Sequence, residues 1–383
     1  MIRLRVLFLI DRAVDHGGAE RFAVGLAGAL AAKRYELWFC STREIEPAVA
    51  DALDRAGVRR LELGRRSKWD AHRFAGLAAV LRRERIDVLH AHMFGSNVWG
   101  TIIGRACRVP VVIAHEQTWS YRGEPLRAWL DGHLVGRFAT RFVAVSSLDA
   151  ERMVSVEGVP PEKVVMIPNA YVPRPGALER DLRAELGLDA ATPLIGAVSV
   201  LRPQKALTVL LEAFSLVLEE RPDAHLALAG DGPCRHELRV RARELELDGR
   251  VHFLGRRSDV DSILRALDVA AMSSDYEGTP LVAFECFANG TPLVATAVGG
   301  LPDVVADGET GVLVPPRRAD ALAAALSSLI GDPGRRERIA AAAAGRLAEF
   351  TLDAATQRFA GLYEQLAAEA SPRSSLPAAR RRS

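Results

Sequence analysis

The sequence predicts an α/β protein built from two doubly wound parallel sheets. Short runs rich in β-branched and aliphatic residues alternate with amphipathic helical patterns along most of the chain. This alternation starts again after the proline-rich stretch 168–175. The chain has 383 residues, 49% of them hydrophobic, which exceeds what one core usually organises and is ample for two. We therefore expect one domain over residues 1–172 and a second over 173–349.

Six strands are expected in each half. In the first half they are the apolar runs 6–10, 37–40, 58–63, 88–91, 111–114 and 142–145. In the second half they are 194–200, 226–229, 251–254, 269–272, 293–295 and 312–314. Ligands of such sheets bind beyond the carboxyl ends of the strands, so the active site is expected in the cleft between the domains. Residues 371–383 read as a disordered tail.

The composition of the chain indicates the class of protein and the cell compartment in which we expect it. Residues 3–10 hold too few apolar residues for a secretory signal or a membrane span. The four cysteines lie far apart without paired spacing, which is typical of core positions in a reducing cytoplasm. The net charge is +2, and residues 1–170 hold 25 Lys and Arg against 19 Asp and Glu. We expect a cytoplasmic protein with no nucleic-acid partner.

The first half favours an anionic partner. Its densest basic cluster interleaves cations with apolar residues and consists of Arg59, Arg60, Arg65, Arg66, Lys68, Leu61, Leu63 and Trp69. This mixture is compatible with peripheral contact to an anionic membrane on its inner face, and an ordinary solvated face is the alternative.

The most informative segment runs from Asp275 to Gly290. Thr279 suits an N-cap, Pro280 the first helical position and Gly290 the residue past the end, which predicts a helix over 280–288. This places Glu277 in the preceding loop and Glu285 inside the helix. Gly278 and Leu281 complete a helix start at which a diphosphate can rest, with carboxylates accepting sugar hydroxyls on either side. Two glutamates at this spacing are also common by chance.

Two further loops follow strands and offer ligand contacts. After the first strand, Gly17 and Gly18 let the backbone approach a ligand and open a helix, although a tight turn without a ligand explains them too. After the strand near residue 198, Arg202 and Lys205 are suited to clamp a phosphate; the alternative is a pair of surface cations.

Residues 277–315, Gly-Gly-Ala-Glu at 17–20 and Arg202 with Lys205 together resemble the retaining glycosyltransferases of family four, also called group 1. The resemblance implies the GT-B fold, two Rossmann-like domains with a last helix, about 350–367, that crosses back to the first domain. It implies that Arg202 and Lys205 bind the donor diphosphate, that Arg256 or Arg257 lies near the base and that His115 contacts the donor sugar. His90 and His92 end the preceding strand; one is expected in the sheet and the other in the acceptor pocket.

Two positions depart from the family pattern. Ala206 stands where relatives have glycine, which is tolerable if the residue is already helical. Ala170 and Tyr171 follow Asn169 in place of glycine and valine, which predicts a stiffer connection between the domains.

The expected function is transfer of a hexose-type sugar from a nucleotide diphosphate sugar to a glycan or lipid-linked glycan, with retention of configuration. The cations are expected to replace a metal ion, and no cofactor is implied. A nucleotide-sugar epimerase and a non-catalytic nucleotide-sugar binding protein on the same scaffold are the alternatives.

Overall fold

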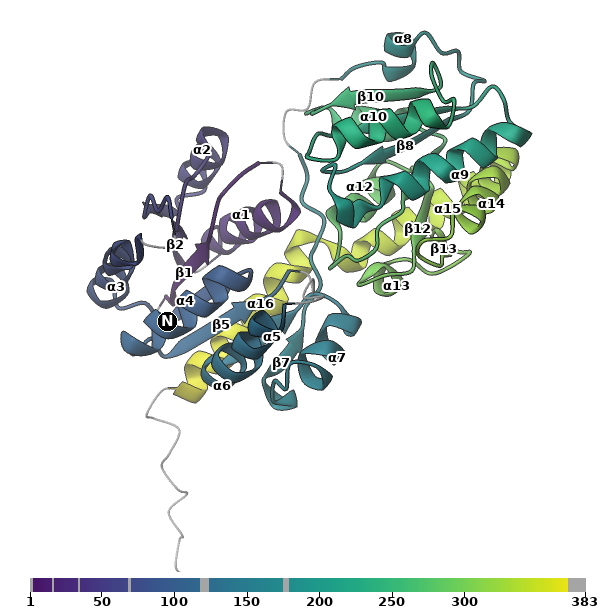
Figure 1. The fold of residues 1–383 in the computed structure, drawn as a ribbon. Helices are drawn as coiled ribbons and strands as arrows, with labels where there is room; N and C mark the ends of the chain where they lie inside the picture. The colour runs from purple at the N-terminus through teal and green to yellow at the C-terminus, as the bar shows by residue number, and fades with distance from the viewer. Residues whose placement is uncertain are drawn as a thin grey trace, which may run out of the picture. The chain divides into compact units, whose positions relative to one another are not determined.

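The computed structural model describes residues 3–15, 17–33, 35–67, 70–117, 124–174 and 179–370. Its contacts divide the chain into two compact units (Figure 1). Unit 1 runs from the N-terminus to Val172 and resumes at Leu352, and unit 2 covers Pro173–Thr351. The tail expected over 371–383 lies outside the described residues. Among the described helices, none combines the length and apolar character that crossing a bilayer requires.

Unit 1 is organised by one parallel sheet of seven strands in the order β3-β2-β1-β4-β5-β6-β7. The sheet is doubly wound, because the order runs outward in both directions from β1 and β4. The strands are β1 (Arg5–Ile10), β2 (Glu36–Ser41), β3 (Arg59–Glu62), β4 (Val88–His92), β5 (Val111–His115), β6 (Arg141–Ala144) and β7 (Val164–Met166).

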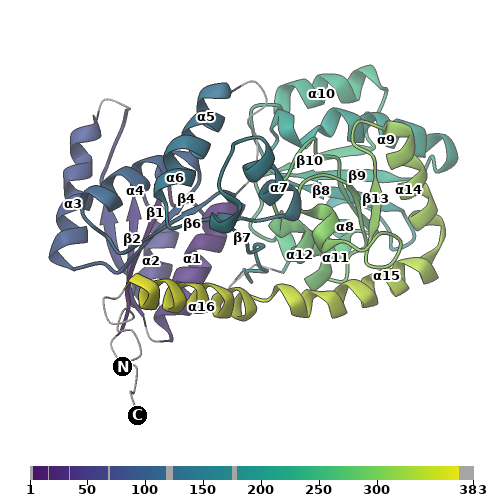
Figure 2. The same ribbon diagram turned by 90° about the horizontal axis from the view of Figure 1, so that it is seen from below.

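Alternation along the strands separates the two faces of this sheet. On β1, Phe8 belongs to the core under α1 (Gly18–Ala31) and α16 (Leu352–Ala370). Its neighbour Leu7 points to the other face, in a core shared with α3 (Phe74–Arg83) and α4 (Phe94–Ala106). Figure 2 shows α16 running along the face that α1 covers. The remaining helices of unit 1 are α2 (Pro47–Arg55), α5 (Pro125–Leu130), α6 (Gly136–Phe138) and α7 (Ser147–Ser155).

Unit 2 repeats the plan with six parallel strands in the order β10-β9-β8-β11-β12-β13. The strands are β8 (Leu194–Val198), β9 (His225–Ala229), β10 (Val251–Gly255), β11 (Val269–Met272), β12 (Leu293–Thr296) and β13 (Val312–Val314). One face is covered by α9 (Leu207–Glu220), α10 (Arg235–Glu244) and α14 (Ala319–Gly331), of which α9 and α14 lie side by side in both views. The other helices are α8 (Leu182–Leu186), α11 (Val260–Ala266), α12 (Leu281–Ala288), α13 (Leu301–Val304) and α15 (Pro333–Arg346).

The two sheets confirm the α/β class and the doubly wound plan, and they add one strand. All twelve expected strands form; two match their expected bounds, and the ends of the others differ by at most two residues. The seventh strand of unit 1, β7, was not expected. It is three residues long and half-exposed at the sheet edge, so it lacks the apolar run that marks a buried strand. The last helix occupies 352–370 rather than 350–367, because 347–350 forms a 3-10 turn.

Candidate active site: a lysine and carboxylate at the strand ends of unit 2

The candidate site of unit 2 lies where the order in which the strands follow one another along the sheet reverses. β8 and β11 are neighbours in the sheet but are separated by two strands in sequence, and β9 continues the sheet on the far side of β8. The loops after β8 and β11 therefore leave a topological switch point, the usual ligand site of an open α/β sheet. Arg202 and Lys205 lie in the first loop and Glu277 in the second.

Lys205 and Glu277 form an ion pair at this point. Lys205 Nζ lies 2.5 Å from Glu277 Oε1, and the Ser274 hydroxyl donates to the same oxygen at 2.6 Å. The side chains of Lys205 and Glu277 are only 20% and 6% exposed. Because both charges are largely removed from water, the pair is electrostatically stronger than a surface salt bridge. The structure thus joins two residues that the sequence suggested separately.

Side-chain and backbone bonds fix the two loops to each other. Ser273 Oγ donates to the Lys205 carbonyl at 2.8 Å, and Gln204 Nε2 donates to the Tyr276 carbonyl at 3.2 Å. The Asp275 amide donates to the Gln204 carbonyl at 2.9 Å. These contacts hold the ammonium and the carboxylate in place without relying on their own attraction.

The turn that carries Lys205 depends on an unusual backbone at the next residue. Residues Pro203–Lys205 form a 3-10 turn, and α9 begins at Leu207. Ala206 between them has φ 44° and ψ 41°, which is left-handed. The expectation that Ala206 is already helical is therefore wrong. An alanine here carries strain that a glycine would not, because its Cβ approaches the carbonyl.

The start of α12 also differs from the expected register by one residue. Pro280 is the N-cap, with extended ψ of 127°, and the helix begins at Leu281. Thr279 therefore precedes the cap and Pro280 precedes the helix, because the extended ψ of Pro280 delays the first helical turn. Gly290 does follow the helix, with φ 66°. The first N–H groups of α12 have no partner within the helix and carry its positive dipole end.

A glycine of the next loop shapes the backbone around Glu277. Gly299 has φ 55°, and a Cβ on it would lie 1.8 Å from the Glu277 carbonyl oxygen. Beside it, the Gly300 amide donates to the Gly278 carbonyl at 2.7 Å. The loop after β12 thus braces the loop after β11 through backbone contacts that no side chain permits.

Glu285 is buried at 1% exposure, and its partner is a residue that the sequence did not indicate. Arg174 Nε donates to Glu285 Oε1 at 3.0 Å, from a side chain that is 22% exposed. Arg174 stands between Pro173 and Pro175 at the beginning of unit 2. The only signal in the sequence is a cation in a proline-rich segment, which does not identify the acid it faces.

Three arginines named from the sequence in unit 2, Arg202, Arg256 and Arg257, differ in how exposed they are. Arg202 is exposed and lines a small hollow together with Ala206, Cys234 and Glu237. Arg256 is also exposed. The adjacent Arg257 is bound by Asp259 and Glu185 at 2.6 to 3.0 Å, and these carboxylates raise the pKa of its guanidinium. Arg257 is therefore a structural residue.

An Asp-x-Asp sequence, which in some enzymes holds a divalent ion, occurs at Asp259 to Asp261. Here Asp259 is paired with Arg257, and Asp261 accepts from Asn289 at 3.0 Å. The Arg257 guanidinium also lowers the pKa of the Asp259 carboxyl. These partners give both carboxylates a structural role in unit 2.

In unit 1, Gly17 and Gly18 open α1 as expected. Gly17 is the N-cap and Gly18 the first helical residue. The side chain of Glu20, three residues after the cap, turns back toward Gly17. A Cβ added to Gly17 would lie 1.9 Å from Glu20 Oε2. The carboxylate of Glu20 therefore lies beside Gly17 at the start of α1. An anionic ligand at this helix start has to displace it.

His115 is fully buried within unit 1. The Asn169 amide donates to Gln117 Oε1 at 2.9 Å, which turns Gln117 Nε2 toward His115 Nε2 at 3.3 Å. His115 Nδ1 lies 3.1 Å from His90 Nε2. Because Gln117 Nε2 can only donate, the neutral His115 carries its proton on Nδ1 and donates to His90.

His90 continues this chain to α16. Its Nδ1 lies 2.6 Å from the Tyr363 hydroxyl, and it donates there because its Nε2 accepts from His115. His90 and His92 are both 0% exposed among the described residues. Neither therefore lines an open pocket in this structure. Burial lowers the pKa of all three histidines, that of His92 to about 3.

The three histidines are also a possible metal-binding group. One ring nitrogen from each of His90, His92 and His115 lies within 4.8 Å of the others. Two of these rings already hold protons in the chain to Tyr363, and the walls are the aromatic rings of Phe8, Phe22 and Phe359. Hydrogen bonds thus account for His90 and His115, whereas neither ring nitrogen of His92 has a hydrogen-bond partner among the described residues.

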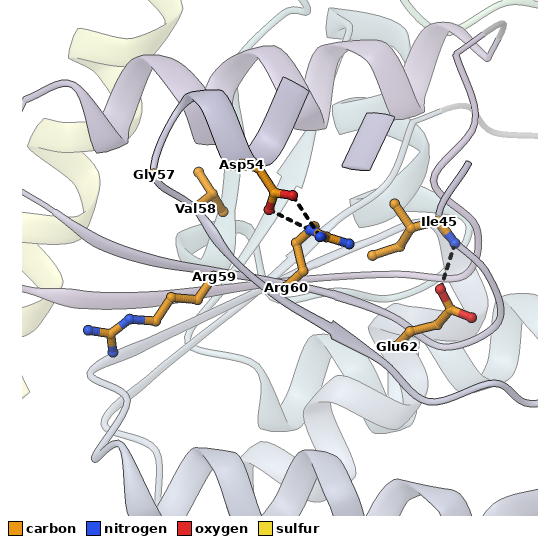
Figure 3. Close-up of a pocket in the computed structure, with 7 residues that line it drawn as sticks. All are labelled: Ile45, Asp54, Gly57, Val58, Arg59, Arg60 and Glu62. Carbon is orange, nitrogen blue, oxygen red and sulfur yellow. Dashed lines mark hydrogen bonds and ion pairs between the residues drawn. The ribbon is translucent and has the colours of Figure 1, made fainter. Parts of the chain in front are cut away.

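A hollow on unit 1 lies apart from these residues. Figure 3 shows it along the edge strand β3, where Arg60 pairs with Asp54 and Glu62 accepts from the Ile45 amide. Lys68 and Trp69 of the basic cluster lie outside the described residues. Arg60 holds Asp54 through two bonds of 2.6 and 2.7 Å, and Arg59 Nη1 lies 3.7 Å from Glu84. Asp54 therefore pairs with Arg60, whereas Arg59 shares Glu84 with Arg83, whose Nε lies 2.8 Å from that carboxylate.

Known proteins share both the sequence pattern and the fold. Residues 179–346 match the family described as glycosyl transferases group 1, and residues 16–173 match glycosyltransferase family 4. A D-inositol 3-phosphate glycosyltransferase of Thermomonospora curvata is 32% identical, over 91% of this chain and 90% of its own. An alpha-D-kanosaminyltransferase of Streptomyces kanamyceticus is 29% identical, over 75% and 79%.

Solved structures agree with this assignment at the level of the fold. HepE of Anabaena, solved with UDP-glucose, is 23% identical and superimposes with a TM-score of 0.82, covering 95% of this chain and all of its own. Sucrose-phosphate synthase of Thermosynechococcus elongatus, also 23% identical, gives a TM-score of 0.78 over 96% and 100%. The chain belongs to the group 1 glycosyltransferases of family four and has their GT-B fold.

Proposed function

We propose that this glycosyltransferase takes its sugar from a nucleoside diphosphate sugar held at the strand ends of unit 2. The observation that carries the proposal is the buried pair of Lys205 and Glu277 beside the N-terminus of α12. A diphosphate is attracted by the ammonium, by the exposed guanidinium of Arg202 and by the helix dipole. The solved relative HepE of Anabaena binds UDP-glucose, which supports this class of donor.

The ion pair gives Lys205 and Glu277 separate tasks once the donor is bound. The ammonium turns to the phosphate oxygens, where negative charge grows as the bond between the sugar carbon and the phosphate oxygen breaks. Glu277 then has an oxygen free to accept a hydroxyl of the sugar, while Ser274 still donates to it. Pairing before binding keeps either charge from being buried alone.

We propose that transfer retains the anomeric configuration. The acceptor oxygen attacks the sugar carbon from the face that the phosphate leaves, and its proton passes to the leaving phosphate oxygen. Glu277 is not a nucleophile in this scheme, because its carboxylate accepts the Ser274 hydroxyl and a hydroxyl of the sugar. Arg202 and Lys205 supply the positive charge that a metal ion supplies in other transferases, so the reaction is proposed to be metal-independent.

Roles for Gly17, Gly18, Arg256 and His115 belong to the same proposal. Gly17 and Gly18 give a ligand access to the start of α1 when Glu20 moves aside. Arg256 is the exposed cation at the end of β10 and is assigned to the base. Contact of His115 with the donor sugar requires Gln117 to release His115 Nε2.

The acceptor is proposed to be a glycan or a lipid-linked glycan, handled on the cytoplasmic side of a membrane. A second candidate is a small polyol phosphate, which is favoured by the names of relatives such as the D-inositol 3-phosphate glycosyltransferase of Thermomonospora curvata. The two differ in whether product formation needs a lipid phase.

Thermal unfolding with uridine, guanosine and adenosine diphosphates at one shared concentration, about 100 times the dissociation constant of the tightest binder, tests the donor class. The matching nucleotide is expected to add about 2.7 kcal/mol of stability by mass action. Addition of a chelator is expected to leave both binding and transfer unchanged. A protein that none of the three diphosphates stabilises would refute the proposed donor site.

A further inference from the structure

One helical run of unit 1 exposes an unusual amount of apolar surface. α5, a π-helical turn over Asp131–Val135 and α6 follow one another without a break over residues 125–138 (Figure 2). Leu126, Trp129 and Phe138 in this run are 67%, 54% and 52% exposed. Large apolar side chains exposed to this extent on one short element indicate a surface that binds a partner.

The exposed residues share one side of the run. Leu126, Trp129, His133 and Arg137 follow each other at spacings of three and four residues, and all are exposed. The Trp129 and His133 rings stack, with centroids 5.1 Å apart. We call these four residues together with Phe138 the α5–α6 surface. It carries aromatic, aliphatic and basic groups and no acidic one.

The opposite side of the run is fixed to unit 1. A Cβ on Gly132 would lie 1.7 Å from the Glu157 carbonyl oxygen, and a Cβ on Gly136 would lie 2.9 Å from Val159. Val135 is completely buried in the same core. This contact leaves the helix no freedom to rotate its apolar residues inward, so their exposure is built into the fold.

The carboxyl end of the run carries a cluster of positive charge. Arg105 Nε donates to the Phe138 carbonyl at 2.6 Å, and the Lys163 ammonium donates to the carbonyls of Arg137 and Ala139. Burial lowers the pKa of Lys163, and the nearby guanidiniums of Arg105, Arg141 and Arg137 lower it further against the opposite effect of Glu162. Positive charge therefore dominates the field at Lys163.

We propose that the α5–α6 surface docks on an anionic lipid bilayer. Trp129, Leu126 and Phe138 enter the interfacial region, where aromatic side chains are favoured, and the basic end faces lipid phosphates. The cluster of Arg59 and Arg60 is less suited to this, because its neighbour Leu63 is buried and Leu61 is only partly exposed, so less apolar surface accompanies the charge. The inference extends the proposed function, since a lipid-linked acceptor is reached from a membrane surface.

Flotation of the full chain with vesicles tests the docking surface. Vesicles of phosphatidylcholine with about one third phosphatidylglycerol are compared with phosphatidylcholine alone. Binding is expected only to the anionic vesicles and to weaken at high salt. Loss of Arg137 in Arg137→Gln is expected to weaken binding about fivefold. The double variant Trp129→Gln with Phe138→Gln is expected to weaken it at least about tenfold, because apolar area leaves the interface.

The matched control changes exposed apolar residues of unit 2. Leu216 and Val240 are 39% and 38% exposed, and Leu216→Gln with Val240→Gln is expected to bind vesicles like the unaltered protein. Circular dichroism checks that each variant is folded. Binding of the nucleoside diphosphate to the surface variants should be unchanged, so a failure of docking is separable from a failure of the donor site.

Three outcomes would overturn the proposal. They are no binding to anionic vesicles, equal binding by the surface variant and its control, and a dimer in solution that the surface variant abolishes. The last would assign the α5–α6 surface to a second copy of the chain.

Discussion

Lys205 Nζ lies 2.5 Å from Glu277 Oε1, although the two residues are 72 positions apart in the sequence. Neighbouring strand ends bring them together, and three bonds between their loops hold them there. The pair links the fold to the proposed chemistry. We propose that the pair keeps a cation and an acceptor together until a donor separates them.

Removing the cations is expected to reduce turnover. Arg202→Ala and Lys205→Ala should each lower kcat by about a hundredfold, or roughly 3 kcal/mol, because each loses charge that acts on the departing diphosphate. Arg202 is exposed, so its variant should unfold at nearly the same denaturant concentration as the unaltered protein. Arg243→Ala, at an exposed position on α10, is the control and should keep full activity. Equal rates for Arg202→Ala and Arg243→Ala would remove Arg202 from the site.

Gly299 is expected to be irreplaceable for a steric reason. Gly299→Ala sets a Cβ against the Glu277 carbonyl oxygen and should destabilise unit 2 by about 2 to 4 kcal/mol. Gly308 has a similar positive φ of 75°, but nothing lies within 4 Å of its Cβ position. Gly308→Ala should therefore cost only about 1 kcal/mol of backbone strain. Equal losses in urea unfolding would show that φ alone, and not the close approach, matters at Gly299.

Ala206 is expected to be a site of stabilisation. Ala206→Gly relieves a left-handed alanine and should raise the free energy of unfolding by about 0.5 to 1 kcal/mol, after the entropy of glycine in the unfolded chain is counted. Ala213→Gly in the right-handed body of α9 is the control, and it should lower stability by about 1 kcal/mol or more. A stability loss at both positions would contradict the strain assigned to Ala206.

The buried histidines predict a loss of stability in mild acid. Burial lowers the pKa of His90, His92 and His115 in the folded protein, whereas the unfolded chain binds protons near pH 6.5. At about one pH unit or more above 6.5 neither state is protonated, so these residues confer almost no pH dependence there. Between pH 6.5 and 5.5, each histidine should reduce the free energy of unfolding by about 1 kcal/mol, because only the unfolded chain takes up the proton.

His92→Leu isolates one of these contributions. His92 packs against the Phe8 ring at 5.3 Å, so leucine fits an apolar site there. Between pH 6.5 and pH 5.5, the free energy of unfolding of the variant should fall by about 1 kcal/mol less than that of the unaltered protein. Urea unfolding at both pH values measures this difference. The same pH dependence in both proteins would mean that His92 is protonated when folded.

The sequence predicts most strands correctly because a buried strand requires a continuous apolar run, as in β1 and β11. It does not predict β7, because an exposed edge strand does not need that run. It predicts the residues near α12 but places the helix start one position early, since threonine and proline at 279 and 280 suit two capping registers. The positive φ of Ala206 was hidden because alanine favours helix.

The hydrogen-bond and ion-pair partners of the site residues were harder to predict from the sequence than the site residues themselves. Arg174 faces Glu285 from 111 positions away, and only the packing of unit 2 brings them together. The pairing of Lys205 with Glu277 likewise depends on the neighbouring places of β8 and β11 in the sheet. A motif gives the kind of side chain and its loop, whereas the sheet order determines which side chains meet.

Glu277 and Glu285 are expected to act on different parts of the donor, and titration and transfer assays can separate their roles. Calorimetric titration with the nucleoside diphosphate, beside a transfer assay, compares Glu277→Gln with Glu285→Gln. We propose that Glu285, which Arg174 holds in this structure, accepts the ribose hydroxyls of the donor, so Glu285→Gln should weaken diphosphate binding because an amide accepts less strongly than a carboxylate. We expect Glu277→Gln to bind the diphosphate almost normally and to lose transfer, because its partner is a hydroxyl of the sugar being moved. Equal weakening of diphosphate binding by both variants would contradict the account and make the two glutamates structural supports of α12.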